Sequence, residues 1–474
     1  MSRMKRVLLI NSNVETKPYP VPPLGLCLVA AALAETHEVR VHDGTFDAGG
    51  GVGDAVRDFA PDYVGIGVRN IDDVILDGGT HYVEGIFRDF VRPVREATGA
   101  PLILGGAGFS IFPGPLMERF GADYGVVGEA ETALPALLAA LEGGGRAEDV
   151  PGIVTKGGGA ARGNGRPAGT LALPFSRIDR WIDFGPYRER GSYPIQTKRG
   201  CAHECAYCTY PTIEGRRYRV RAPREVVDEI EEAAGRLGTV TFEVVDSTFN
   251  YPPGHVEASC AESAARRLAV RLRTMGVNPG AITADLLRRM KDAGFAQIDC
   301  TPDTASPRML VSLGKNFDLP ALERAAALID ELDMPTMWCF VFGGPGETQE
   351  TVRETLDFVD RHVAERDMVH MTEGLRIYPG TPLHREALAE GIVGPADDLL
   401  ASRFYVSPAL GRERLSELLL DASRTRPHCI RAQDSTPDPA MLREAFRVRR
   451  EQGLTEPMFR TLLRLHRDRI RRAS

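Results

Sequence analysis

Three cysteines stand close together at Cys201, Cys205 and Cys208, in the stretch "RGCAHECAYCTY", whereas the other cysteines of the chain are scattered. A structural zinc site needs four ligands, usually supplied as two close pairs. In a cubane 4Fe-4S cluster, three thiolates bind three of the four irons and leave the last iron open to a small molecule. The spacing therefore favours a cluster with an open iron. Zinc with His203 as the fourth ligand remains an alternative.

The first 150 residues are predicted to fold into a domain of their own ahead of the cysteine loop. Short apolar runs such as "RVLLI", "YVGIGV" and "PLILGG" alternate with helical stretches such as "TALPALLAALEGG". This alternation predicts an α/β domain with a doubly wound, Rossmann-like parallel sheet. Ligands of such sheets bind at the carboxyl ends of the strands, where this chain has "GGAG" at 105–108 and "GEAE" at 128–131. A glycine-rich loop in this position is as often a tight turn as a ligand cradle.

From Tyr193 the alternation resumes in six strand-helix units, which predict a partial (β/α)6 barrel with the cysteine run after its first strand. The glycine-rich stretch 156–170 has no hydrophobic period and is typical of a linker or exposed hairpin. After about residue 394 the chain is expected to be mostly helical. The sequence thus predicts four parts: 1–150, a linker over 151–192, a barrel over 193–393, and a helical region over 394–474.

The bulk composition restricts the partners. The net charge of -7 gives no general attraction to nucleic acid or anionic membranes. The apolar run at the N-terminus is too short for a signal peptide core or a membrane span. We therefore expect a cytoplasmic protein with no nucleic-acid partner and no membrane span. In that reducing compartment, clustered cysteines hold metal more often than they form disulfides.

The cysteine spacing, its position after the first barrel strand and the aromatic Tyr207 resemble the radical S-adenosylmethionine (SAM) superfamily. In that family the open iron binds the methionyl part of SAM, and one electron from the cluster cleaves SAM to give a 5'-deoxyadenosyl radical. The resemblance implies that Cys201, Cys205 and Cys208 bind a 4Fe-4S cluster and that Tyr207 lies against the adenine. It also implies an electron donor such as a flavodoxin or ferredoxin.

Three further stretches match that family in the same order along the barrel, "FEVVDSTFN", "FGGPGET" and "RIYPGTPL", and a fourth at the corresponding strand, "TPDTASPRML", departs from its pattern. The resemblance implies SAM contacts in these stretches, at Asp246, Asp303, Gly344, Glu347, Arg376 and Tyr378. Asp303 is a departure, because relatives usually carry a glutamate there, with a longer reach. Each stretch taken alone also fits an ordinary strand-to-helix turn.

The N-terminal half resembles the cobalamin-binding domain that precedes the barrel in a large subgroup of these enzymes. The matching stretches include "LILGGAGFSIFPGPLMERFGADYGVVGEAETALPALL". The resemblance implies cobalamin contacts at Gly105, Gly106, Gly128 and Glu129. The Asp-x-His-x-x-Gly motif that supplies a cobalt ligand in other cobalamin proteins is absent, and His42 and His81 do not fit it. A domain kept for architecture, without cobalamin, is the alternative.

Together the two resemblances imply a cobalamin-dependent radical SAM methyltransferase that transfers a methyl group from methylcobalamin to an unactivated carbon or phosphorus of a small molecule. A cyclase, rearrangement or oxidative radical enzyme with the same cofactors is an alternative within the same class. A non-catalytic iron-sulfur or zinc protein is an alternative from another class. The sequence identifies neither the substrate nor a catalytic residue. Trp338, in "PTMWCFVFG", fits an apolar substrate site and a buried core equally well.

Overall fold

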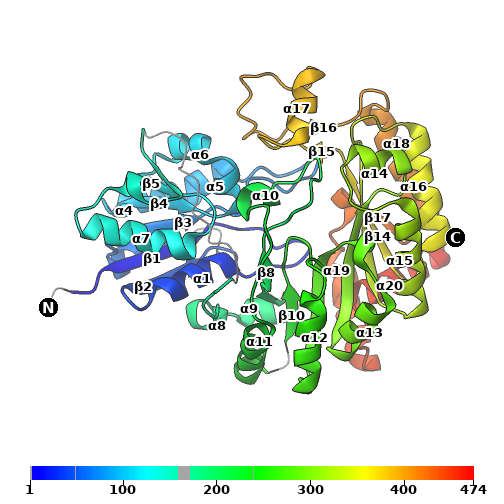
Figure 1. Cartoon of the computed structure of the whole chain (residues 1–474), viewed down its shortest axis with the longest axis horizontal. Helices are drawn as coiled ribbons and strands as arrows, with labels where there is room; N and C mark the ends of the chain where they lie inside the picture. The colour runs from blue at the N-terminus through cyan, green and yellow to red at the C-terminus, as the bar shows by residue number, and fades with distance from the viewer. Residues whose placement is uncertain (1–2, 48–49, 158–170, 239, 474) are drawn as a thin grey trace.

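The computed structural model describes residues 3–47, 50–157, 171–238 and 240–473. An N-terminal sheet and a C-terminal sheet lie side by side (Figure 1). The first has the strand order β2-β1-β3-β4-β5-β6, and every pair is parallel except β5 with β6. Its strands are β1 (Arg6–Asn11), β2 (Glu38–Asp43), β3 (Tyr63–Gly67), β4 (Leu102–Gly105), β5 (Tyr124–Val126) and β6 (Ile153–Thr155).

Helices cover both faces of this first sheet, because β1 is apolar on both sides. Val7 and Leu9 pack with α1 (Leu24–Leu33) and α7 (Ala130–Glu142). Leu8 and Ile10 pack with α2 (Val52–Phe59), α4 (Arg92–Ala97) and α6 (Pro113–Phe120). A strand buried on both faces has a continuous apolar run, whereas a strand buried on one face has an alternating one. The run "VLLI" in β1 is continuous.

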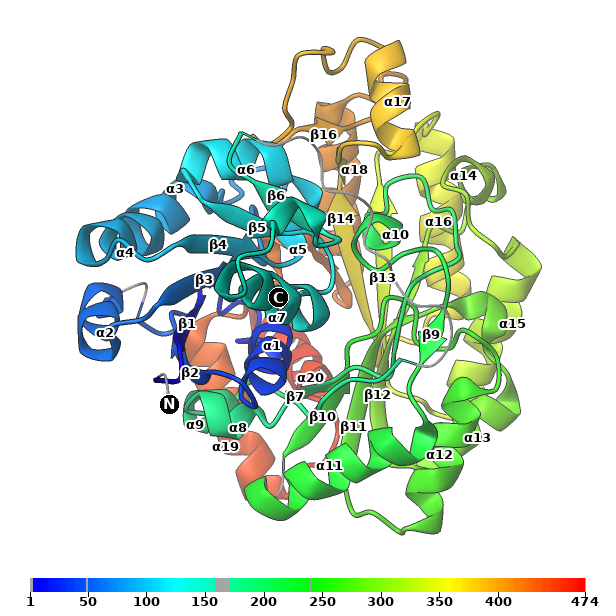
Figure 2. The same ribbon diagram turned by 60° about the vertical axis from the view of Figure 1, so that its left-hand side comes forward.

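The second sheet contains seven parallel strands in the order β17-β14-β13-β12-β11-β10-β7. They are β7 (Tyr193–Ile195), β10 (Thr241–Val244), β11 (Arg271–Val277), β12 (Phe295–Asp303), β13 (Thr336–Phe342), β14 (Met368–Glu373) and β17 (Cys429–Arg431). Figure 2 shows these strands as a curved fan with helices along its outer side. The principal helices are α11 (Pro223–Leu237), α12 (His255–Ala265), α13 (Ala284–Asp292), α15 (Leu319–Glu331), α16 (Gln349–His362) and α18 (Arg412–Thr425). Since β7 and β17 are both edge strands, the barrel is partial.

Shorter elements lie between these principal strands and helices, and several of them surround the cysteine loop. They are α3 (Val83–Ile86), α5 (Ala107–Ile111), α8 (Ile178–Trp181), α9 (Gly185–Arg188), β8 (Lys198–Arg199), α10 (Tyr210–Ile213), β9 (Arg219–Val220), α14 (Pro307–Ser312), β15 (Leu375–Arg376), α17 (Pro382–Ala389) and β16 (Phe404–Tyr405). The antiparallel β8-β9 pair is a ribbon on either side of the cysteine run. In Figure 1, α10 lies beside α5, at the junction of the two sheets.

The predicted fold class is confirmed, and two details differ from it. The first sheet continues to β6, a few residues beyond the expected boundary at 150. The region after 394 contains α18, α19 (Pro439–Gln452) and α20 (Met458–Ala473), as expected, and it also contributes β17 to the barrel sheet. Three residues are too few for a periodic strand signal, which is why β17 was not predicted. The predicted linker at 156–170 falls almost entirely outside the described residues.

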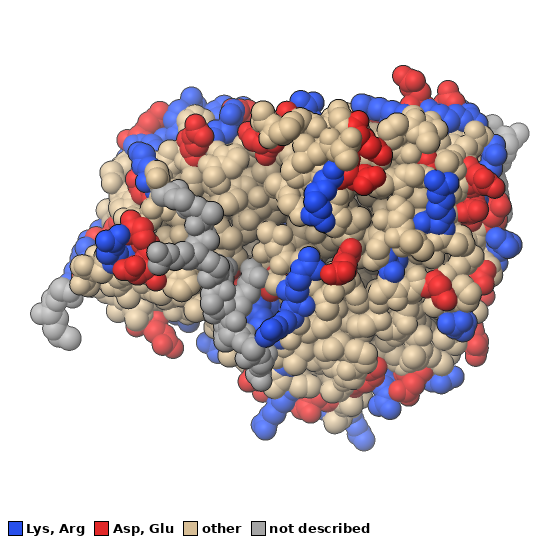
Figure 3. Space-filling view, turned by 45° about the horizontal axis from the view of Figure 1, so that its top comes forward, with Lys and Arg blue, Asp and Glu red and all other residues tan. Residues whose placement is uncertain are grey.

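The barrel sheet has an outer face that packs on helices and an inner face that stays partly accessible. On β13, Trp338, Phe340 and Phe342 are buried in the core under the helices, whereas Met337 and Cys339 point the other way. Trp338 is therefore a core residue. Among the described helices, none is long and apolar enough to cross a membrane. On the face shown in Figure 3, basic and acidic side chains are interspersed and do not gather by sign.

Candidate active site between the two sheets

The cysteine loop is fixed by backbone contacts on both sides. Gly200 precedes the first cysteine with φ +90°, and a Cβ at this position would overlap with the carbonyl of Arg217. Only glycine fits such a backbone at no steric cost. The Cys201 amide donates to Gly215 O at 3.0 Å, and the Ala206 amide donates to Leu313 O at 3.0 Å. The loop is thus held between the β8-β9 ribbon and the end of α14.

The three thiols lie in surroundings that suit iron and disfavour free thiolates. Cys201 is buried, and Cys205 and Cys208 are half-buried. Burial and, to a smaller extent, the neighbouring cysteines raise the pKa of Cys208 to about 12. Burial also raises the pKa of Cys205. Three thiolates this close to one another need a cation, and the irons of a cluster supply that charge, so the residues fit a cluster.

The mononuclear zinc alternative gains no support from the geometry. The Nε2 atom of His203 lies 3.3 Å from the Tyr218 hydroxyl, and its ring packs edge-on against Tyr251. Within the described ranges, no three His, Cys, Asp or Glu side chains are arranged to hold one metal ion. Thiolates of a cubane need no such arrangement, because each binds a different iron.

Tyr207 and Asp303 meet beside the cysteine loop. The Tyr207 hydroxyl donates to Asp303 Oδ2, and Lys315 Nζ donates to the same atom at 2.7 Å. Lys315 Nζ also lies 3.9 Å from Cys205 Sγ. Asp303 has φ +67°, a conformation that aspartate adopts more readily than most residues. The structure therefore brings together two residues predicted for SAM with a lysine that was not predicted, and their contacts with SAM stay predictions.

Asp246 is buried at the end of β10, with both carboxylate oxygens engaged. It accepts hydrogen bonds from Thr197 N at 2.8 Å, Thr197 Oγ1 at 2.6 Å and Lys198 N at 3.3 Å. These bonds hold the segment that leads into the cysteine loop. In this geometry Asp246 supports that loop. Its predicted contact with the SAM amino group stays a prediction.

Gly344 and Glu347 form a compact turn after β13. The Glu347 carboxylate accepts from the amides of Gly343 and Gly344, the latter at 2.9 Å, while its Oε1 has no partner among the described residues. Burial raises the pKa of Glu347 to about 7. A Cβ on Gly344 would lie 2.9 Å from Met309 Cε, so this glycine lets the turn pack closely on α14. Their contacts with SAM remain predictions.

The "GGAG" loop after β4 combines a tight turn with one open position. Gly106 has φ +100°, and a Cβ there would lie 2.5 Å from Val68 O, so this glycine is needed for close backbone packing. By contrast, a Cβ on Gly105 would have Val126 O at 4.0 Å as its nearest neighbour. Gly105 thus leaves space at the carboxyl edge of the sheet, where ligands of this fold bind, and so fits a bulky cofactor.

The "GEAE" loop binds the other half of the chain. Arg219 Nη1 donates to Glu129 Oε2 at 2.9 Å, its Nη2 pairs with the other oxygen, and Arg199 Nη1 lies 3.3 Å from Glu129. Glu131 pairs with Arg199 as well. The four side chains are 4 to 14% exposed. We call this group the arginine latch. It joins the loop after β5 to the ribbon around the cysteines, whereas Gly128 N donates within its own domain to Ser110 Oγ at 2.9 Å. The predicted cobalamin contacts of Gly128 and Glu129 stay untested.

A second buried ion pair joins the domains on another side. Arg376 Nε donates to Asp72 Oδ2 at 2.8 Å, and the guanidinium also donates to the carbonyls of Ile377 and Leu399. The guanidinium carbon of Arg376 lies 5.0 Å from the centre of the Tyr378 ring. Arg376 and Tyr378 therefore lie at the contact between the domains, and their predicted approach to the adenine remains a prediction. Together with the arginine latch, this pair sets the carboxyl edge of the first sheet against the cysteine loop.

The inner face of the barrel carries polar groups that the sequence did not single out. Cys339 and His370 are direct partners across β13 and β14. Burial raises the pKa of Asp299, on β12, to about 7 and lowers the pKa of His370. Tyr19, from the loop after β1, reaches this face and donates to Glu243 Oε1 at 3.0 Å. No periodic pattern could indicate these residues, since their meeting depends on the register of the strands.

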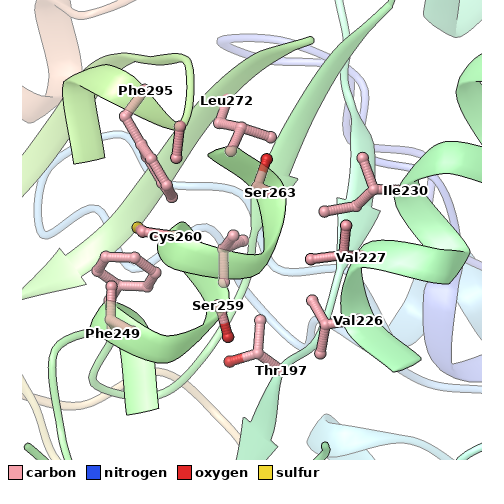
Figure 4. Close-up of a pocket in the computed structure, with 13 residues that line it drawn as sticks. Thr197, Val226, Val227, Ile230, Phe249, Ser259, Cys260, Ser263, Leu272 and Phe295 are labelled. Carbon is pink, nitrogen blue, oxygen red and sulfur yellow. The ribbon is translucent and has the colours of Figure 1, made fainter. Parts of the chain in front are cut away.

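An apolar cavity lies on the opposite side of the barrel sheet, under α11 and α12 (Figure 4). It has room for about 30 Å³ and is lined mainly by apolar side chains such as Val227, Phe249, Leu272 and Phe295. A space of this size holds about one water molecule. It is a packing defect of the core and too small for a substrate.

Two family models match the chain, one for each sheet. The B12 binding domain matches residues 11–138, and the radical SAM superfamily matches residues 195–359. The first match covers β2 to β5 of the first sheet, including the open Gly105, and the second begins just before the cysteine loop. The two matches therefore cover the loop after β5 on one side of the interface and the ribbon around the cysteines on the other.

Relatives of the whole chain carry methyltransferase names. The tryptophan 2-C-methyltransferase of Streptomyces laurentii is 29% identical over 80% of this chain and 74% of its own. The cytidylyl-2-hydroxyethylphosphonate methyltransferase of Streptomyces wedmorensis is 25% identical over 84% of each chain. Among solved structures, the radical SAM methyltransferase TsrM from Kitasatospora setae, with tryptophan and a SAM analogue bound, superposes with a TM-score of 0.84 at 26% identity. That match covers 99% of both chains.

Proposed function

We propose that this chain, a radical SAM enzyme with a B12-binding domain in front of its barrel, methylates an unactivated carbon or phosphorus of a small polar molecule. The observation that carries the proposal is the shared interface, in which the arginine latch joins the loop after β5 to the ribbon around the cysteines. Transfer of a one-carbon group between two cofactors requires their reacting atoms to lie within contact distance. A fixed interface of this kind would hold the two cofactor sites at a constant separation, which supports the proposal.

The cofactors would occupy the two sides of that interface. When bound, the cluster would supply an electron to SAM and the cobalamin would supply the methyl group. Cys201, Cys205 and Cys208 would hold the cluster, with Tyr207 and Asp303 at its edge, and the space at Gly105 would admit the cobalamin. We further propose that the first domain ends near residue 157 and that the barrel includes β17.

The substrate class follows from the inner face of the barrel. Side chains there include Asp299, Cys339 and His370, with Glu243 and Arg273 ion-paired at 2.9 Å. An apolar lipid would bury such groups without supplying the further hydrogen bonds they can make, at a cost of about 1–3 kcal/mol for each group left unsatisfied. A polar or aromatic metabolite with hydrogen-bonding groups suits this surface better. The electron would come from a flavodoxin or ferredoxin, in the reducing cytoplasm that such a cluster requires.

The proposal is tested with SAM labelled in its methyl group. The protein is reconstituted without oxygen with iron, sulfide and hydroxocobalamin, reduced, and incubated with the labelled SAM. We expect label in the cobalamin fraction in the absence of any substrate. A Cys201→Ala variant, which should lose the cluster, serves to separate the contribution of cluster-bound SAM from that of cobalamin alone. Intact cluster and cobalamin with no label on cobalamin would contradict the methyltransferase assignment.

A further inference from the structure

The cysteine loop approaches the protein surface on one side. Cys201 is buried at the β8-β9 ribbon, and Cys208 leads into α10, which packs on α5 of the first domain. Cys205 is half-buried, and the side chain of Glu204 beside it is 82% exposed. The α14 helix lies on this side, and Figure 2 shows it at the rim of the barrel, away from the first sheet. Electron transfer slows steeply with distance, so an external electron carrier has to sit on a surface of this kind.

The chain that follows α14 packs against the backbone of Cys205. Gly314 has φ +67°, and a Cβ built on it would lie 2.7 Å from Glu204 O and 3.8 Å from Cys205 Cα. The Gly314 amide donates to Val311 O at 3.0 Å. Val311 is therefore separated from a cysteine that would hold the cluster by one hydrogen bond and one backbone contact.

The outer face of α14 carries an exposed apolar spot. Pro307 and Val311 lie one helical turn apart, and both are exposed, Val311 to 82%. Met309 and Leu310, on the other side of the helix, are buried. The exposed pair is thus an apolar surface directly beside the cysteine loop.

Basic side chains lie around this spot. Arg308 is exposed on α14 itself, three residues before Val311, and its Nη2 is 3.4 Å from the Cβ position of Gly346. Arg216 and Arg217 are exposed as well, and Arg216 Nη1 lies 3.5 Å from Glu204 Oε1. Three guanidinium groups thus stand against one carboxylate. We call the following residues the α14 face: Glu204, Arg216, Arg217, Pro307, Arg308 and Val311.

We propose that the α14 face is the docking surface for a flavodoxin, a small acidic protein that carries electrons on a flavin. This inference rests on the proposed function, because it presupposes a cluster on the three cysteines. The accessible edge of the flavin in such a protein is its apolar dimethylbenzene ring, surrounded by acidic side chains. Pro307 and Val311 would meet that ring, and the arginines would face the acidic rim. The reduced flavin would lose one electron, which passes to the cluster, and no proton or bond is exchanged.

The modest size of the α14 face suits such a partner. Electron-transfer complexes are short-lived and bury less surface than stable complexes, below about 1,200 Å² in total. Complementary charge in such complexes raises the rate of association more than the affinity. The arginines should therefore act chiefly on how fast the electron arrives.

The test measures how fast the cluster is reduced. Reconstituted protein is mixed without oxygen and at low ionic strength with a purified, reduced bacterial flavodoxin, and the electron paramagnetic resonance signal of the reduced cluster is followed in samples frozen at successive times. We expect Arg216→Glu, Arg308→Glu and Val311→Asp each to lower the second-order rate constant about 10-fold. Added salt should slow the wild type steeply. Sodium dithionite, a small reductant that needs no docking surface, should reduce every variant at the wild-type rate.

Arg288→Glu is the matched control, because it makes the same charge reversal at an exposed position of α13, away from α14 in Figures 1 and 2. It should keep the wild-type rate with flavodoxin. Binding of oxidised flavodoxin to the cluster-free protein is a second readout, which Arg308→Glu should weaken and Arg288→Glu should leave unchanged.

Three results would overturn the proposal. The α14-face variants could behave like the control, they could be slowed equally with dithionite, or a ferredoxin could show the charge dependence where flavodoxin shows none. A failure of the proposed function looks different. A cluster that flavodoxin reduces, without any label reaching cobalamin, would contradict methyl transfer and leave the docking surface in place.

Discussion

The arginine latch predicts a measurable coupling between Glu129 and Arg219. Breaking a buried ion pair by removing one partner costs about 3–5 kcal/mol, because the other charge is left without a partner in the interior. Here the remaining contacts reduce that cost, since Glu129 keeps Arg199 at 3.3 Å and Arg219 keeps Glu214 O at 3.2 Å. We therefore expect either Glu129→Gln or Arg219→Gln to lower the free energy of opening of the cysteine loop by about 2 kcal/mol. The double variant should lose little more than one single variant.

Hydrogen exchange of the cysteine loop is the suitable assay, because global unfolding of a chain of this size is seldom two-state. A loss of 2 kcal/mol should speed exchange of the amides near Gly200 and Cys201 roughly 30-fold. The exposed pair Arg57–Asp54, with side chains 60 and 76% exposed, serves as the control and should contribute about 0–1 kcal/mol. The reasoning is refuted if the two single effects simply add in the double variant, or if they are no larger than those of the control pair.

Three further predictions concern the loop, a buried acid and the core. Gly200→Ala should abolish iron binding, because the added Cβ would overlap with Arg217 O. The control is Gly235→Ala in α11, where an added Cβ has no neighbour within 4 Å and the iron content should stay unchanged. Equal iron content in the two variants would contradict this prediction. Glu347 keeps its proton up to about pH 7 when folded and only to about pH 4.5 when unfolded, so its contribution to stability falls as pH rises between these values. Glu347→Gln should flatten that fall in thermal melts, and an unchanged pH profile would disprove it. Val227→Ile should fill part of the cavity in Figure 4 and raise the free energy of unfolding by about 0.8 kcal/mol. A lower melting temperature would show that the cavity cannot take a methyl group.

Local sequence patterns were sufficient to predict the frame of the molecule. Continuous apolar runs separated by helical periods identify both parallel sheets, and the spacing of Cys201, Cys205 and Cys208 identifies the loop between them. Each of these signals is formed by residues that are close together along the chain. They are therefore readable without knowing how distant segments meet.

The interface itself could not be predicted in this way. Glu129 lies in a loop of a type that often binds ligands, yet its carboxylate pairs with Arg219, which is 90 residues further along the chain. Arg376 similarly pairs with Asp72, 304 residues away. Such pairs have no periodicity, because they depend on how two separately folded sheets dock.

Cofactor stoichiometry tests the central claim most directly, namely that this interface holds two cofactors. The protein is reconstituted without oxygen with iron, sulfide and hydroxocobalamin, desalted, and assayed for iron, sulfide and cobalt. We expect about four irons, about four sulfides and one cobalt per chain. Four irons without cobalt would leave the radical SAM chemistry of the barrel in place but contradict the two-cofactor interface and the methyl transfer proposed for it.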